Sequence, residues 1–154
     1  MRAGERGSVY LWLMGILVVM GLLLGKAVEV QASRAERQRE AMVLTIGEAY
    51  RQAIGSYMQA PGSNGQYPTR LEDLLTDNRF PVPVHHLRQA YPDPETGGEW
   101  VLIKEGQAIV GVHSASTRAP FKRQNFPARY KDFESAATIG DWQFIYTRTA
   151  AKSP

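Results

Sequence analysis

The chain has 154 residues, no cysteine, and 18 Lys and Arg against 15 Asp and Glu, which gives a formal net charge of +3. The missing cysteine excludes disulfides, thiol chemistry and cysteine-based metal sites. Residues 60–154 contain eleven basic and ten acidic residues, so the excess positive charge lies nearer the N-terminus and does not by itself indicate a nucleic acid as partner.

A long uncharged segment lies close to the N-terminus. Residues 7–25 (GSVYLWLMGILVVMGLLLG) contain no formal charge and are flanked by Arg6 and Lys26. At about 1.5 Å per residue, a helix of this length covers a hydrocarbon core of roughly 30 Å. The segment is longer than the apolar region of a secretory signal and lacks a clear cleavage site of small residues, so we interpret residues 8–26 as a retained membrane span. Positive charges on both sides leave its orientation open.

The helical pattern continues beyond this segment. Residues 27–59 contain no proline, so the sequence predicts that the same helix extends through an exposed half at residues 27–60. Apolar residues recur there at spacings of three and four, and we expect this stripe to pack against the rest of the chain. The stripe consists of Val43, Ile46, Tyr50, Ile54 and Tyr57. The charged run at 34–40 is interpreted as a solvated collar. Gly21 and Gly25 form a small-xxx-small pair that would let another helix approach.

The start of the chain resembles the type IV prepilin signature, which pilins share with the pseudopilins of type II secretion. The resemblance rests on a short leader at residues 1–7 that ends in Arg6-Gly7 directly before the apolar helix. It implies that a membrane peptidase cuts after Gly7 and that Ser8 becomes an N-methylated terminus. The chain departs from the pattern at Ser8, where the family usually has Phe or Met. It departs again at Trp12, where the family usually has a glutamate that pairs with the amine of a neighbouring subunit.

Residues 61–148 are predicted to form a small head, followed by a flexible tail at 149–154. Residues 60–66 (APGSNGQ) end the long helix. A short helix is expected within 67–75, with a Thr69–Glu72 capping box and a buried side made by its leucines. Those leucines are Leu71, Leu74 and Leu75.

The strands of the head are expected after a proline-punctuated connection at 77–84. Residues 100–104 and 107–114 read as two strands joined by a turn at Glu105-Gly106. Residues 141–148 read as a closing strand that places Trp142, Phe144 and Tyr146 on one face.

This order of elements resembles the pilin fold, an α+β fold in which a small antiparallel sheet of three or four strands packs on the exposed half of one long helix. Tyr-Pro before LEDLL, the YPDP turn at 91–94 and Asp-Trp at 141–142 also resemble pseudopilin heads. The resemblance implies a structural, non-enzymatic subunit of a bacterial type II secretion or type IV pilus machine. Such a subunit is anchored in the inner membrane with its head in the periplasm. Its partners would be other pilin-like subunits, inner-membrane assembly proteins and the prepilin peptidase.

Two other functions remain open. The chain could be a single-span periplasmic adaptor or binding protein that never polymerises, or a minor pilin that binds DNA. The DNA alternative rests on residues 118–131 (RAPFKRQNFPARYK), which interleave basic and aromatic residues as single-stranded nucleic-acid sites do. We instead expect this segment to be a loop that covers the sheet edge, with its aromatic rings buried and its charges in water.

No metal, cofactor or catalytic site is expected. Candidate calcium ligands occur at Asp132, Glu134 and Asp141, and in a different loop at Asp93 and Glu95. They do not form the clustered loop that supplies six to eight oxygens to calcium.

The three histidines do not suggest a metal site either. Adjacent His85 and His86 point in different directions, so we interpret them as surface residues. His113 is interpreted as a hydrogen-bonded structural residue. The chain has no nucleophile elbow, P-loop, dinucleotide fingerprint or HExxH motif.

Overall fold

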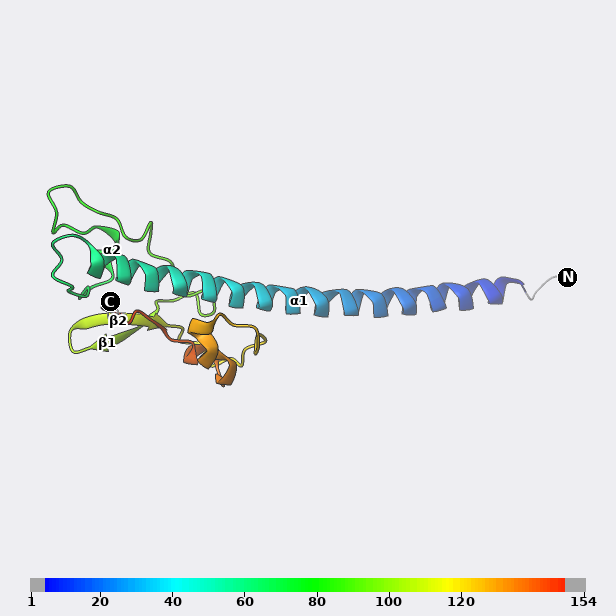
Figure 1. Cartoon of the computed structure of the whole chain (residues 1–154). Helices are drawn as coiled ribbons and strands as arrows, with labels where there is room; N and C mark the ends of the chain where they lie inside the picture. Colours follow the sequence, from blue (N-terminus) through cyan, green and yellow to red (C-terminus); the bar gives the residue numbers. More distant parts are fainter. Residues whose placement is uncertain (1–4, 149–154) are drawn as a thin grey trace. The chain divides into compact units, whose positions relative to one another are not determined.

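The computed structural model describes residues 5–148, and it describes side chains for all of these except residues 5–8, 22–30 and 32. The chain divides into two compact units, residues 1–38 and 39–154. Helix α1 (Glu5–Gln59) contributes residues to both units (Figure 1). The rest of the described chain contains helix α2 (Glu72–Leu75), strands β1 (Val101–Glu105), β2 (Ala108–His113) and β3 (Phe144–Ile145), and the 3-10 helices η1 (Ala128–Ser135) and η2 (Ile139–Asp141). The predicted α+β class with a small antiparallel sheet is confirmed.

In the first unit, the described part of α1 carries large apolar side chains that all lie in the open. Residues 9–21 are exposed without exception. Within the described part of the chain, no helix combines the length and the apolar content that crossing a membrane needs. Residues 22–26 of the predicted span, Gly25 among them, and residues 7 and 8 lie outside the residues whose surroundings are described. The tail at 149–154 also lies outside the described residues.

The second unit is built around a three-stranded antiparallel sheet in the order β1-β2-β3. The β1–β2 ladder ends at the pair Glu105 and Ala108, and its register shifts between Ile103 and Lys104. The turn therefore consists of Gly106 and Gln107, one residue later than predicted. Gly106 has a φ of 64°, a left-handed conformation that two-residue hairpin turns require and that glycine adopts without strain.

The closing strand is much shorter than the predicted 141–148. Strand β3 contains only Phe144 and Ile145, which pair with Val112 and Gly111 of β2. Upstream, a carboxylate oxygen of Asp141 accepts a hydrogen bond from the Thr138 amide at 2.7 Å. This local bond favours the 3-10 turn of η2 over an extended ladder. The period-two pattern still places Trp142 and Phe144 in the core, where both are fully buried.

Helix α2 is also shorter than predicted, and the predicted Thr69–Glu72 capping box is wrong. The Asp73 carboxylate, instead of Glu72, accepts hydrogen bonds from the Arg70 amide at 3.1 Å and the Thr69 hydroxyl at 3.4 Å. Glu72 pairs with the Arg70 guanidinium on the surface. Leu74 is fully buried, and Leu71 and Leu75 pack partly buried against the core.

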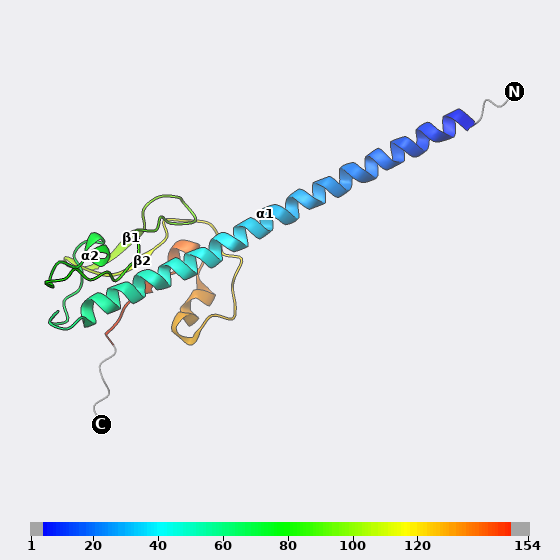
Figure 2. The ribbon, with the colours of Figure 1, turned by 90° about the horizontal axis from the view of Figure 1, so that it is seen from above.

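The core lies between the later turns of α1 and one face of the sheet. Two glycines of α1 allow this close approach. A Cβ atom at Gly47 would lie 2.3 Å from the Phe144 ring, and one at Gly55 would lie 2.4 Å from the Tyr146 ring. Figure 1 and Figure 2 show both α2 and the β1–β2 hairpin next to these turns. An aromatic cluster of Trp100, Phe126, Phe133, Trp142 and Phe144 fills the remaining space.

Candidate functional site

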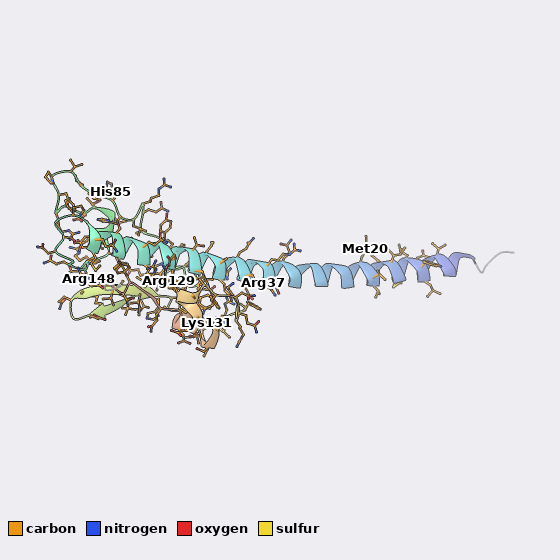
Figure 3. The ribbon with its side chains drawn as sticks, viewed as in Figure 1. Met20, Arg37, His85, Arg129, Lys131 and Arg148 are labelled. Atoms are coloured by element: carbon orange, nitrogen blue, oxygen red, sulfur yellow. The ribbon has the colours of Figure 1, made fainter. Side chains whose placement is uncertain are left out.

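The predicted processing and assembly residues lie in the first unit. Gly7 and Ser8 fall within α1, but the surroundings of these two residues are outside what the structure describes. Trp12 is 73% exposed. A Cβ atom added at Gly21 would meet no other atom within 4 Å. Figure 3 shows the side chain of Met20 pointing away from the helix in the same stretch. In this unit the described apolar side chains therefore have no protein cover.

The apolar stripe of α1 faces the core of the second unit. Val43 and Ile54 are fully buried, and Tyr50 is 2% exposed. Tyr57 is 8% exposed and Ile46 is partly buried. The Tyr50 hydroxyl donates to the Tyr91 carbonyl and accepts from the Tyr91 amide, both at 3.0 Å. The stripe thus packs on the head and also holds the connection that leads into β1.

Glu40 overturns part of the solvated-collar interpretation. Its side chain is buried, and its carboxylate accepts the backbone amides of Phe121 at 2.7 Å and Lys122 at 3.0 Å. Arg118 lies 3.4 Å from the same carboxylate and also binds Glu95 with two hydrogen bonds. A buried carboxylate is stable only when it is hydrogen-bonded and paired. The burial of Glu40 therefore depends on the 118–122 loop, and its hydrogen bonds hold this loop against α1. The partners lie 81 and 82 positions away in the sequence, so no local pattern pointed to them.

A second acidic residue of α1, Glu48, anchors the basic and aromatic segment at 118–131. Arg51 donates to both carboxylate oxygens at 2.7 Å, Arg129 binds at 3.0 Å, and the Tyr130 hydroxyl donates to the same group. The Arg51 hydrogen bonds lower the pKa of Glu48 to about 2. Burial raises the pKa of Tyr130 to about 12, with the help of the Glu48 charge.

The segment at 118–131 is only partly the covering loop that the sequence predicts. Phe126 is buried and Tyr130 is partly buried, but Phe121 is 47% exposed. Figure 3 shows Arg129 and Lys131 on this segment. Arg118 and Arg129 pair with carboxylates of the same chain, which lowers the positive charge that this segment offers to a phosphate backbone.

The interpretation of both histidines at 85–86 as surface residues is wrong for His86. Its side chain is 3% exposed and lies between two partners. Nδ1 is 2.8 Å from the Ser56 hydroxyl and Nε2 is 3.2 Å from a carboxylate oxygen of Asp77. Asp77 itself is buried, and its carboxylate accepts hydrogen bonds from Nε and Nη2 of Arg79. These hydrogen bonds lower the pKa of Asp77 to about 2. His85, in contrast, is exposed (Figure 3).

The candidate calcium ligands serve other structural purposes or lie apart. Asp93 is fully buried and accepts hydrogen bonds from its own turn and from Ser114 at 2.7 Å. Glu95 binds Arg118, and Asp141 caps η2. Asp132 and Glu134 are exposed on η1. In the described part of the chain, no group of three or more His, Asp or Glu side chains is arranged to hold a metal ion.

The open grooves of the second unit include two in which segments distant along the chain form a ligand-sized space. The first, of about 890 Å³, lies between the last turns of α1, the connection around Phe80–Val84 and Tyr146. Ser56 and His86 form part of its wall. The second, of about 690 Å³, lies between β1, the 69–75 segment and the turns at 90–92 and 97–99. The sequence contained no signal for either groove, because each is lined by segments that are distant along the chain.

Comparisons with protein-family models, with curated proteins and with solved structures found no match to this chain.

Proposed function

We propose that the protein is a pilin-like structural subunit, of the pseudopilin kind, of a bacterial type II secretion or type IV pilus machine. The supporting observation is that α1 divides into two parts with different surroundings. Its early described residues, 9–21, are apolar and exposed, whereas its later residues pack on a small antiparallel sheet. This division is typical of a helix that places one half in lipid or among other subunits and carries a head on the other half.

The apolar half needs a partner that the head does not supply. Leu11 is 76% exposed, Leu17 59% and Val19 55%. A contiguous apolar surface of this kind is costly in water and marks a membrane or protein contact. The proposed sequence of events is insertion into the inner membrane, processing after Gly7, and lateral packing of α1 helices. Ser8 and Trp12 remain atypical for this family, so processing is the step that the experiment addresses.

The test is expression of the full-length chain with an active prepilin peptidase, followed by intact-mass measurement and N-terminal sequencing. The expected product lacks residues 1–7 and begins at an N-methylated Ser8. The controls are an inactive peptidase and two matched variants of the leader. Gly7→Val should block cleavage, whereas Gly4→Val should not. An intact Met1 in the presence of the active enzyme would contradict the proposal and would favour the adaptor that does not polymerise.

A further inference from the structure

The β1 strand has a free outer edge. Within residues 5–148, the only backbone hydrogen-bond partner of β1 is β2, on its other side. The opposite edge of the sheet differs, because β3 has only two residues and Phe144 packs on Gly47 of α1. A free strand edge presents rows of N–H and C=O groups that another extended segment can satisfy.

The groove of about 690 Å³ runs along this edge. Alternate residues at the start of and along β1, namely Trp100, Leu102 and Lys104, line it, and no described residue of β2 does. Its other wall carries Leu71, Leu75 and Tyr91. The Trp100 indole N–H already donates to the Tyr91 carbonyl at 3.1 Å, and its ring is only 5% exposed, so Leu71, Leu75 and Leu102 carry most of the apolar surface of the groove. The floor is therefore suited to the apolar side chains of a strand placed beside β1.

The register of the hairpin gives one outward donor. Glu105 and Ala108 flank the two-residue turn, and in such hairpins this first pair is the one that exchanges hydrogen bonds across the ladder. The N–H and C=O of the preceding residue, Lys104, therefore point away from β2 and towards the groove side of the strand. Proline is tolerated at such a position because no ladder bond is lost.

From these observations we propose that the head binds an extended polypeptide segment, which adds to β1 as a fourth strand with every second side chain in the groove. The occupant is a short peptide of alternating apolar residues rather than a second sheet. The groove is lined by α2 and residues 90–92 as well as by β1, and its volume of about 690 Å³ suits one short segment. Main-chain hydrogen bonds supply the affinity and the groove supplies the preference for apolar side chains, as in other cases of strand addition.

Charge gives the bound segment a direction. Glu99 precedes β1 and Lys104 lies near its end, and both line the groove. Five residues of extended chain separate them by about 17 Å, at ~3.3 Å per residue. A segment parallel to β1 with a basic residue at its start and an acidic residue at its end complements both groups. This inference does not depend on processing or on filament formation.

The test uses the full-length protein in mild detergent and a fluorescein-labelled peptide, KVTVTE, with fluorescence anisotropy as the readout. Saturable binding is expected at peptide concentrations on the order of 100 µM, the range of a small strand-addition contact. The same peptide N-methylated at alternate residues keeps its side chains but loses its donors, and should bind roughly tenfold more weakly. Hydrogen–deuterium exchange should slow in residues 101–105 when the unmodified peptide binds.

Two substitutions at Lys104 distinguish the contribution of its backbone N–H to peptide binding from that of its side chain. Lys104→Ala removes the charge and should weaken binding no more than roughly fivefold. Lys104→Pro also removes the outward N–H and should bind at least about tenfold more weakly than Lys104→Ala. Circular dichroism verifies that both variants fold, and the N-methylated peptide tests the unmodified protein if either does not.

Four results would overturn the inference. They are the absence of saturable binding, equal binding of the two peptides, protection that spares residues 101–105, and a concentration-dependent dimer that Lys104→Pro abolishes. The last result would assign the edge to a second copy of the chain.

Discussion

At the scale of single residues, the most consequential group is the buried carboxylate of Asp77. It binds Arg79 and His86, and Arg79 also donates to the Tyr57 carbonyl at 2.9 Å and lies 3.6 Å from the Tyr57 ring centre. One carboxylate thus orders the 77–86 connection and the end of α1. Because Arg79 is partly exposed, the loss of this carboxylate should cost less than the loss of one member of a fully buried pair.

We therefore expect Asp77→Asn to lower the free energy of unfolding by about 2 kcal/mol at pH 7. The Arg79 hydrogen bonds lower the pKa of Asp77 from 3.8 to about 2. The stabilisation is consequently complete above about pH 4 and is lost as the pH falls towards 2. Urea unfolding of both proteins between pH 7 and pH 2.5 measures the difference, which should narrow only at the acid end. Glu134→Gln, at an exposed position, is the control. A difference that stays constant with pH would contradict this role.

At the scale of elements, the contact between α1 and the closing strand depends on two glycines. Gly47→Ala places a Cβ atom 2.3 Å from the ring of Phe144, which is fully buried and must shift to accommodate it. We expect a loss of about 2 kcal/mol, which overpacking of a core typically costs. Gly55→Ala meets Tyr146, whose partly exposed ring can shift, and should cost less than about 1 kcal/mol. Thermal unfolding of the head measures both.

The matched control for these variants lies on the same helix. Gly15 has no atom within 4 Å of an added Cβ, so Gly15→Ala tests helix propensity alone and should not destabilise the head. If Gly47→Ala proved as stable as Gly15→Ala, the close contact between α1 and β3 would be refuted.

Much of the organisation of these helices and strands could be predicted from the sequence. The features that could not be predicted depend on contacts that no hydrophobic pattern reveals. The stripe from Val43 to Tyr57 follows the 3.6-residue period of a helix, and the β1–β2 hairpin follows alternation and a glycine turn. Glu40, His86 and the grooves could not be found in this way, because their partners are distant in sequence or are backbone groups. The closing strand was predicted too long because the Thr138–Asp141 hydrogen bond ends it, a local competition that alternation does not reveal.

At the scale of the whole molecule, Arg118 joins three parts of the chain that are far apart in sequence. Its guanidinium contacts Glu40 of α1 and Glu95 of the 93–98 turn from its own place in the 114–122 loop. Arg118→Gln would leave both carboxylates, which are 3% and 4% exposed, without this cation. We expect a loss of about 3 kcal/mol, measured by urea unfolding. Arg123→Gln, at an exposed position nearby, should change stability by less than about 0.5 kcal/mol. Equal effects of the two variants would show that the network is not structural.

The contacts of α1 also determine when the head can fold during synthesis. Glu40 binds the amides of residues 121 and 122, and Gly47 packs against Phe144. The ribosome therefore synthesises this part of α1 long before the residues that it contacts. At about 5–20 residues per second, roughly 5–20 s separate Tyr57 from Tyr146 on the ribosome. During that interval the apolar stripe is uncovered in the nascent chain. These native contacts join residues far apart in the sequence, so the head cannot complete its fold before Phe144 has been synthesised. A nascent chain with an uncovered apolar stripe is expected to bind chaperones. Deletion of residues 144–148 would leave the stripe uncovered permanently.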